Sequence, residues 1–411
     1  MRLLLSFLKI LFILAITNGY GQYNTIKENK DLILQLMKTK PELFDNLIEN
    51  SKKYRLQIIY TRVITNPDGT KSLQDYYYRL NPDEYVYLAS VIKLPMAALT
   101  LEKLNELKVF GIDRFTSFQM DTNITCDDKP IYNTFIQKKL KNLDMCIRKA
   151  LVLSDNDAYN VMFDFLDSKW INLRLQDMGY DNIRVLTRFI RCNKYENRMS
   201  AGMKFFINNK IVYEKAEHYN ILDFSYKHPI YIGKKHVDND VLIDKPKDFS
   251  NYNFISLLDA HTILKSLVYP ELFNDKQKFN LTQDELNYLL NYLSIYPKEM
   301  NDYSEEYISQ MPDNYMNFIL IGQTKKVENQ HLKVYNKSGM SFGFVSDVAY
   351  IKDTEKNIEF FLSAVIYTNK NEIINDDHYE YAEVAIPFMV SIGKLIYDYE
   401  LFKKNENEKN N

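Results

Sequence analysis

Residues 87–97, Tyr-Leu-Ala-Ser-Val-Ile-Lys-Leu-Pro-Met-Ala, mark the point where the sequence changes from strand-like to helical. Apolar residues continue at helical spacing to Leu107, and Pro95 falls in the first turn, where its missing N–H costs little. Ser90 and Lys93 stand three residues apart at the start of this helix, so their side chains share one face. A lysine facing a serine in a partly desolvated cleft can lose its proton and act as a base.

Strands are predicted on both sides of this helical segment. Upstream, residues 56–63 and 72–80 are predicted to form a hairpin around the turn Asn-Pro-Asp-Gly at residues 66–69. Downstream, three strands and a final helix are predicted at residues 332–337, 343–352, 358–368 and 378–402. Strands at both ends of the chain, with helices between them, indicate one sheet built from both termini.

The predicted fold class is therefore α+β. A mostly antiparallel sheet is expected from residues 22–89 and 330–402, flanked by terminal helices, of which the first covers residues 30–51. An all-helical subdomain is expected to be inserted between the two halves of the sheet, at residues 90–329.

Two further segments depart from this plan. A β-rich insertion is predicted at about residues 203–245, with one hairpin over 204–214 and another over 230–243. The last residues, 403–411, are charged and lack apolar side chains, which predicts a disordered tail.

The first residues carry an export signal. A positive residue, an apolar stretch from Leu3 to Ile16 and small residues before Gln22 are typical of a signal peptide over residues 1–21. We expect an exported protein, periplasmic or secreted, with no stable membrane span after removal of the signal. An uncleaved anchor is the alternative interpretation.

Charge and cysteine content narrow the possible partners. With 52 basic and 54 acidic residues the net charge is −2, which gives no general attraction to nucleic acid. Cys126 and Cys146 could pair and leave Cys192 free, or all three could be buried as small apolar residues. No cysteine or histidine spacing fits a metal site, so no metal and no cofactor is expected. The oligomeric state stays open.

The string Ser154-Asp155-Asn156 follows an apolar run that ends at Leu153. All three residue types suit a loop that caps a helix, which is one interpretation. In the functional interpretation, the Ser154 hydroxyl passes a proton to a leaving nitrogen and Asn156 hydrogen-bonds a substrate carbonyl group.

The string Lys337-Ser338-Gly339 ends a β-branched and aromatic run, so Lys337 stands on a strand. A cation there can hold an acidic substrate, and Gly339 allows a ligand to lie close to the backbone. A strand N–H just after it, at Met340, can complete an oxyanion hole with the N–H of Ser90. The alternative is an ordinary polar strand end.

The order Ser-x-x-Lys, Ser-Asp-Asn, Lys-Ser-Gly resembles the class A β-lactamase family of serine penicillin-recognising enzymes. The continuations at residues 157–163, 175–180 and 339–351 are also similar to that family, including Gly343 and Asp347. The resemblance covers about residues 56–399, without the insertion.

The resemblance implies a role for each residue of these strings. Ser90 is the nucleophile, Lys93 its base partner and Ser154 a proton shuttle, while the backbone N–H groups of Ser90 and Met340 bind the oxyanion. The expected substrate contacts are Asn156, Lys337, Ser338, Gly339 and Met340.

One departure concerns the removal of the acyl group. The family carries an Arg-x-Glu-x-x-Leu-Asn loop whose glutamate activates the deacylating water. Here Arg188-Phe189 fits the start of that loop, but Ile190 falls where the glutamate is expected. Glu196 is the nearest carboxylate and the candidate base.

These observations predict a serine hydrolase that opens β-lactam amides, an activity linked to antibiotic resistance. Its partner is a small β-lactam or peptidoglycan-like molecule. One alternative is a peptidoglycan DD-peptidase, amidase or esterase. Another is a penicillin-binding sensor that is acylated with little turnover.

Overall fold

The computed structural model describes residues 23, 26–121, 123–300, 308 and 310–410. The predicted signal peptide, residues 1–21, lies outside the described residues. Among the helices that are described, none combines the length and the apolar character needed to cross a membrane.

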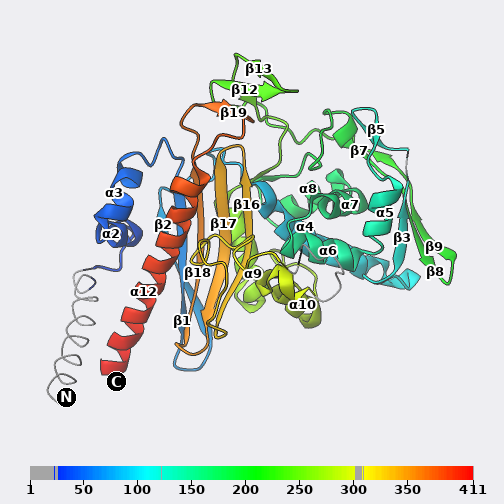
Figure 1. Cartoon of the computed structure of the whole chain (residues 1–411). Helices are drawn as coiled ribbons and strands as arrows, with labels where there is room; N and C mark the ends of the chain where they lie inside the picture. The colour runs from blue at the N-terminus through cyan, green and yellow to red at the C-terminus, as the bar shows by residue number, and fades with distance from the viewer. Residues whose placement is uncertain (1–22, 24–25, 122, 301–307, 309, 411) are drawn as a thin grey trace.

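The centre of the molecule is a five-stranded sheet made from both ends of the chain. Its strands are β1 (Gln57–Thr65), β2 (Lys71–Tyr78), β16 (Leu332–Ser341), β17 (Phe344–Asp353) and β18 (Ile358–Tyr367). They lie in the order β16-β17-β18-β1-β2, and every neighbouring pair is antiparallel (Figure 1). The predicted α+β fold with a sheet from both termini is confirmed, including the hairpin of β1 and β2.

Helices cover both faces of this sheet, which explains why its central strands are almost entirely buried. In β17 every residue except Lys352 is buried, because each side chain meets a helical layer on one face or the other. One layer contains α2 (Leu32–Lys38), α3 (Pro41–Glu49) and α12 (Ile386–Asn410), and the short π-helix η7 (Tyr381–Ala385) leads into α12.

The predicted helix over residues 30–51 is two helices. The break falls at Thr39 and Lys40, because Pro41 disfavours helical geometry in the residue before it and starts α3. Leu36 and Phe44 are both buried in the layer that α12 completes.

The prediction of a disordered tail at residues 403–411 is wrong as far as Asn410, because α12 continues to that residue. Lys403 forms ion pairs with Glu406, one turn along the helix, and with Glu28 near the other end of the chain. Lys404 pairs with Glu408 in the same way. Charged residues at these spacings support the last turns of α12, and residues 403–410 contain no glycine or proline that would interrupt them.

The second layer holds the segment between the two halves of the sheet. Its helices are α4 (Lys93–Leu107), α5 (Thr134–Lys139), α6 (Leu143–Val152), α7 (Asn156–Leu166), α8 (Ser168–Asp177), α9 (Leu257–Val268) and α10 (Gln283–Ser294). A three-stranded sheet in the order β3-β8-β9 packs beside them, formed by β3 (Ser117–Met120), β8 (Met203–Ile207) and β9 (Lys210–Lys215). The region expected to be all-helical thus contains a strand, β3, which pairs with the insertion.

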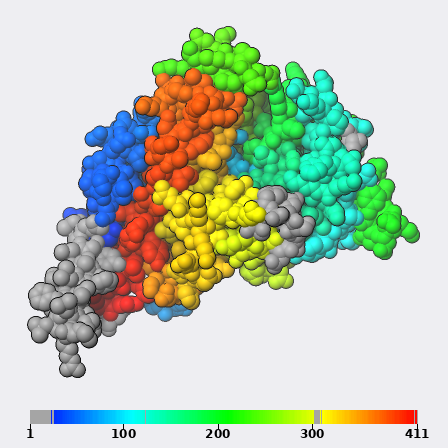
Figure 2. All heavy atoms as spheres, in the orientation of Figure 1, coloured from blue at the N-terminus to red at the C-terminus, as the bar shows by residue number. Residues whose placement is uncertain are grey.

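Both predicted hairpins of the insertion are present. The first is β8 with β9, and the second is β12 (Lys235–Asp238) with β13 (Val241–Ile243). β12 also pairs in parallel with β19 (Ile373–Ile374), from the far end of the sequence. In the space-filling view the second hairpin sits at one end of the molecule, against the orange C-terminal part of the chain (Figure 2).

Short paired strands join the remaining loops. They are β4 (Thr125–Cys126) with β5 (Lys129–Pro130), β6 (Ile183–Arg184) with β15 (Phe254–Ile255), β7 (Met199–Ser200) with β10 (His218–Tyr219), and β11 (Tyr231–Ile232) with β14 (Lys247–Asp248). Single-turn 3₁₀ helices are η2 (Ala89–Ile92), η3 (Lys108–Phe110), η4 (Glu196–Arg198), η5 (Pro270–Leu272) and η6 (Pro297–Glu299).

Candidate active site

Ser90 lies at the junction of the sheet and the helical layer, in the single turn η2 immediately before α4. The residue before it, Ala89, has a φ of +47°, in the left-handed region that alanine rarely adopts. Non-glycine residues held there carry strain that tends to collect at functional sites. Ser90 itself is half-buried.

Gly339, on the edge strand β16, allows this turn to press against the sheet. A Cβ atom added at residue 339 would lie 2.1 Å from Leu88 O and 2.8 Å from Ser90 N. Only glycine permits that approach, so the position of Gly339 determines how closely the strand edge lies to the serine backbone.

Lys93 Nζ is the hub of the site. It lies 3.0 Å from Ser90 Oγ and 3.3 Å from Ser154 Oγ, and it donates to Asn156 Oδ1 at 2.7 Å and to Ser154 O. The lysine is fully buried. The structure therefore brings together four of the residues that the sequence predicts for this site.

Burial lowers the pKa of Lys93 well below its usual range, and the nearby Lys337 lowers it further. This shift favours the neutral amine, which has two N–H groups and one lone pair. The two N–H groups match the two carbonyl acceptors, Ser154 O and Asn156 Oδ1. The lone pair remains for the Ser90 hydroxyl proton, which is the arrangement that a general base requires.

The Ser154-Asp155-Asn156 string serves both interpretations given above. Asp155 caps α7 by accepting from Ala158 N at 3.0 Å, which is the structural role. Ser154 has a φ of +55°, and its Oγ lies between Lys93 Nζ and Lys337 Nζ, 3.1 Å from the latter. A hydroxyl between two amines can accept a proton from one and give a proton away.

Lys337 reaches this cluster from β16 and is fully buried. Burial lowers its pKa to about 7, against the opposing effect of Asp347. The Asp347 carboxylate accepts from the backbone N–H groups of Phe318 and Ile319, each at 2.9 Å, and from Asn336 Nδ2 at 2.8 Å. It therefore anchors the loop behind the strand.

The three residues after Lys337 differ in how far their side chains are exposed to the cleft. Ser338 is buried, and its Oγ donates to Met316 O at 2.7 Å, so this hydroxyl is turned to the protein. Gly339 lies against the serine turn, as described above. Met340 is 46% exposed and lines the cleft.

A cleft of about 820 Å³ opens over Ser90 and is large enough for a drug-sized ligand. Asn156 and Met340 line it on either side of the serine, while the buried amines of Lys93 and Lys337 lie beneath it. The loop of residues 185–198 and parts of the insertion and its return form the remaining walls.

Phe189 is the residue of this loop that faces the lysine. Its ring lies 4.8 Å from Lys93 Nζ, and Asn160 Oδ1 accepts from its backbone N–H at 2.8 Å. Ile190, expected where the family glutamate belongs, is exposed instead. Of these two residues it is thus Phe189, with a phenyl ring, that lies beside Lys93.

A buried ion pair fixes the start of the loop. Arg188 and Asp164 both have fully buried side chains and form an ion pair, and Arg188 Nη1 donates to Glu196 O at 3.0 Å. Tyr132 OH donates to the same carboxylate, and Ala201 N donates to it at 2.9 Å. Sequence reasoning noted Arg188 but missed Asp164 and Asn160, both of which lie on α7 directly after the Ser-Asp-Asn string.

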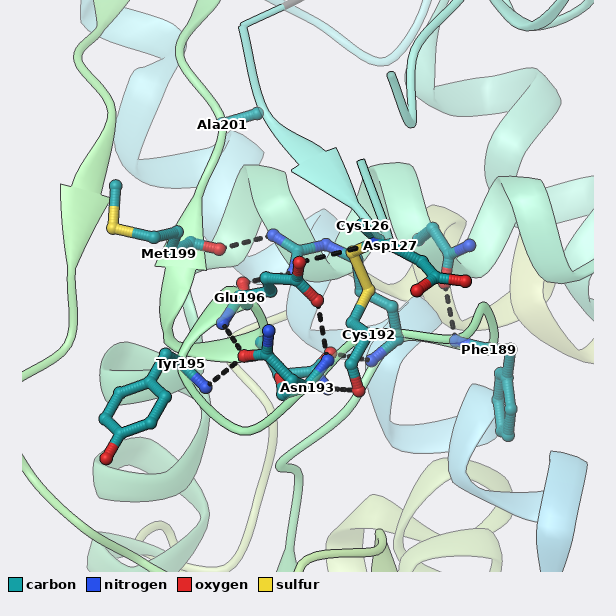
Figure 3. Close-up of a disulfide and its surroundings, with 12 residues drawn as sticks. Cys126, Asp127, Phe189, Cys192, Asn193, Tyr195, Glu196, Met199 and Ala201 are labelled. Atoms are coloured by element: carbon teal, nitrogen blue, oxygen red, sulfur yellow. Dashed lines mark hydrogen bonds between the residues drawn. A yellow bond between two sulfur atoms is a disulfide. The ribbon is translucent and has the colours of Figure 1, made fainter. Parts of the chain in front are cut away.

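The structure places Glu196 away from this cluster, against a disulfide (Figure 3). Its two carboxylate oxygens accept from the backbone N–H groups of Asp127 at 3.2 Å and Asn193 at 2.6 Å. Within the described part of the chain, no contact joins Glu196 to Ser90 or Lys93. Glu196 thus braces the wall of the cleft.

The disulfide joins Cys126 to Cys192, and Cys146 is free and buried. Both sequence interpretations of the cysteines are therefore wrong. The pair that forms is 66 residues apart in sequence, and the fold brings the β4–β5 turn against the loop after Phe189. The two sulfur atoms lie near the Glu196 carboxylate, but sulfurs joined in a disulfide are not the thiolates that bind metals.

The chain was compared with known proteins and with solved structures. No curated protein matches the chain. A class A β-lactamase mutant of the last common ancestor of Gram-negative bacteria is 15% identical, with a TM-score of 0.46, and covers 88% of this chain and 97% of its own. The chromosome-encoded β-lactamase of Vibrio parahaemolyticus is 15% identical, with a TM-score of 0.44, and covers 89% of this chain and 98% of its own.

A family model described as the beta-lactamase enzyme family, Beta-lactamase2, matches residues 43–222. This segment contains Ser90, Lys93 and the Ser154-Asp155-Asn156 string, and it ends within the insertion. Over residues 43–222, which is less than half of the chain, the sequence is thus similar to the beta-lactamase enzyme family.

Proposed function

We propose that the chain is an exported serine hydrolase that opens β-lactam amides through an acyl-Ser90 intermediate. The observation that carries the proposal is the 3.0 Å contact between Lys93 Nζ and Ser90 Oγ, in which the amine also donates to Ser154 O and to Asn156 Oδ1. The hydroxyl proton therefore has an acceptor beside it before a substrate binds.

In the proposed acylation, Ser90 Oγ attacks the amide carbonyl carbon while Lys93 Nζ takes the hydroxyl proton. The proposed oxyanion donors are the backbone N–H groups of Ser90 and Met340, because Gly339 brings the strand edge against the serine turn. Ser154 Oγ then passes a proton to the leaving nitrogen as the C–N bond breaks. The acyl group remains on Ser90.

Two side chains support substrate binding in this proposal. Lys337, with a pKa of about 7, is partly cationic at neutral pH and attracts the acidic group of a substrate. Asn156 is exposed in the cleft, and its Oδ1 is held by Lys93, so its amide N–H group is directed by that bond. A substrate carbonyl group is the partner that this N–H group requires.

The surroundings of Ser90 indicate that the second step, removal of the acyl group by water, is slow. A water that attacks the acyl group needs a base within hydrogen-bond reach. The ring of Phe189 lies over Lys93, at a place where a carboxylate could act as that base. Both oxygens of Glu196 are occupied in the wall of the cleft. This observation supports a second candidate function, a penicillin-binding sensor whose acyl-enzyme persists.

Export is part of the proposal. It is supported by the positive residue, the apolar stretch and the small residues within residues 1–21, which are typical of a signal peptide. N-terminal sequencing of the periplasmic or secreted fraction should find a mature protein that begins near Gln22. Recovery of an intact Met1 from the cytosol would contradict export.

Two measurements test the proposed function. Intact-protein mass spectrometry after incubation with a penicillin should show an adduct, and Ser90→Ala should show none. Steady-state nitrocefin hydrolysis then separates a hydrolase, which turns over, from a sensor, which gives a burst and stops. If the wild type forms no adduct with any β-lactam, the proposal is wrong.

A further inference from the structure

The outer wall of the cleft contains an aromatic and cationic patch that the proposed acyl transfer does not use. Phe342, at the tip of the β16–β17 hairpin, and Tyr252, after the insertion, both line the cleft and are half-buried. Their ring centroids are 5.8 Å apart, and both pack against the buried ring of Phe249. The side chains that form this patch therefore rest on a rigid base.

Lys247 lies over both rings. Its Nζ is 5.6 Å from the centroid of Tyr252 and 5.8 Å from that of Phe342. Lys247 belongs to β14, whose pairing with Ile232 of β11 holds the backbone in place. Ring contacts and the paired backbone thus limit where this ammonium group can go.

The other cations that line the cleft already have partners. Arg188 is paired with Asp164, and Lys194 with Asp223 at 2.8 Å. Exposed Arg191 lies 3.6 Å from Asp238, and Arg198 Nε donates to Asn220 O.

No carboxylate pairs with Lys247 among the residues that the structure describes, and the partner of Arg198 is a backbone carbonyl group. Lys337, the other cation near the serine, is fully buried between Ser154 and its own strand. Lys247 is thus a cation of the outer cleft that no carboxylate of the described residues neutralises, and it lies beside the hairpin tip.

The path from the serine to this ammonium group runs along β16. Gly339 lies against the Ser90 backbone, β16 ends at Ser341, and Phe342 follows in the turn that leads into β17. Met340 and Ser341, between them, line the cleft. A substrate acylating Ser90 and extending toward the hairpin tip places its far end at Lys247.

We propose that Lys247, Tyr252 and Phe342 form a subsite for a carboxylate on the acyl side of the substrate, remote from the bond that is cleaved. The preferred substrate class is thus an acyl donor with an acidic arm. The inference rests on the proposed acylation of Ser90 and adds the substrate feature that the insertion and its return select. Lys247 is a specificity residue in this scheme, since it touches the substrate arm without touching the reacting atoms.

The test uses two cephalosporins that differ in one group, an oxyimino arm ending in a free carboxylate or in its methyl ester. The second-order rate constant for Ser90 acylation is measured by intact mass spectrometry for each compound. Wild type should favour the acid by about five- to tenfold, the effect of one partly exposed ion pair. Raising the salt concentration to 0.5 M should reduce the preference.

Three variants isolate the charge. Lys247→Met keeps the stem against the two rings and should remove the preference for the acid, whereas Lys247→Arg should keep it. Lys245→Met removes an exposed cation two residues away that does not line the cleft, and it should behave as wild type. Thermal denaturation of each variant confirms folding.

Each result decides between named outcomes. An adduct that forms equally fast with acid and ester in wild type, or a preference that survives Lys247→Met, overturns the subsite while the acylation of Ser90 stands. Absence of an adduct with both compounds overturns the proposed function itself, and the subsite with it.

Discussion

The floor and the wall of the cleft are built in different ways. The floor consists of Ser90, Lys93, Ser154 and Lys337, which come from a helix start, a helix cap and a sheet edge and meet in buried hydrogen bonds. The wall is the loop of residues 185–198, held by a disulfide, a buried ion pair and backbone contacts. The floor holds the groups for acylation, whereas the wall presents a phenyl ring to the lysine.

This difference teaches that the two steps of the proposed acyl transfer would rest on different parts of the molecule. In that proposal, acylation depends on core elements whose geometry is coupled to the fold, since Gly339, η2 and the start of α4 pack against one another. Deacylation would depend on a side chain of one loop, which is less tightly coupled to the fold. Five predictions test or sharpen this contrast, in order of decreasing effect.

Replacing the base in the floor should have the largest effect. Lys93→Met removes the acceptor of the Ser90 proton, and general base catalysis commonly contributes about 10²–10⁴-fold. The acylation rate constant for a fluorescent penicillin should fall by that order. Equal rates in the variant and the wild type would exclude Lys93 as the base.

Removing the disulfide should destabilise the wall of the cleft without changing the contacts among the residues of the floor. The Cys126–Cys192 link closes a loop of 66 residues, so Cys126→Ser with Cys192→Ser should lower the free energy of unfolding by about 4 kcal/mol in the chain-entropy account. Urea denaturation measures the loss, and a reductant should destabilise wild type but not the double variant. If both proteins respond alike, the link does not stabilise the fold.

Stability should depend on pH through Lys337. Its pKa is about 7 in the folded protein, far below the usual lysine value, so between pH 7 and 10 the unfolded chain binds more protons than the folded one. The free energy of unfolding should therefore rise with pH, by about 1 kcal/mol per unit. Lys337→Met should flatten this slope between pH 7.5 and 9.5 in urea titrations, and an unchanged slope would show that Lys337 is protonated in the folded state.

Placing a carboxylate in the wall should restore part of the second step. Phe189→Glu sets a candidate base over Lys93, so the acyl-enzyme should decay about tenfold faster, the low end of what a positioned base supplies. Phe189→Leu is the apolar control and should leave the lifetime unchanged. Mass spectrometry of the adduct over time gives both lifetimes, and a faster decay in the leucine variant would assign the effect to ring removal.

The smallest effect is expected at Glu196. Both of its oxygens accept backbone N–H groups, so Glu196→Gln should lose one acceptor and about 1 kcal/mol of stability. The adduct's lifetime should stay the same. A prolonged adduct would instead make Glu196 the deacylating base.

The fold followed from local sequence patterns to a large extent. Hydrophobic periodicity and turn residues predicted the sheet from both chain ends, and the order of three short strings predicted which side chains meet at Ser90. Such signals are readable because each depends on a few neighbouring residues. The helix over residues 403–410 was not predicted, because these residues are charged and lack apolar side chains. The ion pair of Lys403 with the distant Glu28 depends on the tertiary structure and leaves no local pattern in the sequence.

What only the tertiary structure decided lies where distant segments meet. The Cys126–Cys192 pairing, the ring of Phe189 over Lys93, the role of Glu196 and the position of Lys247 over two rings depend on how loops pack. The serine, the lysines and their order could be found in the sequence, because three short strings in one order resemble a known family. An irregular loop has no such period, so the side chain that it points at the reacting atoms is set by its contacts with the rest of the fold.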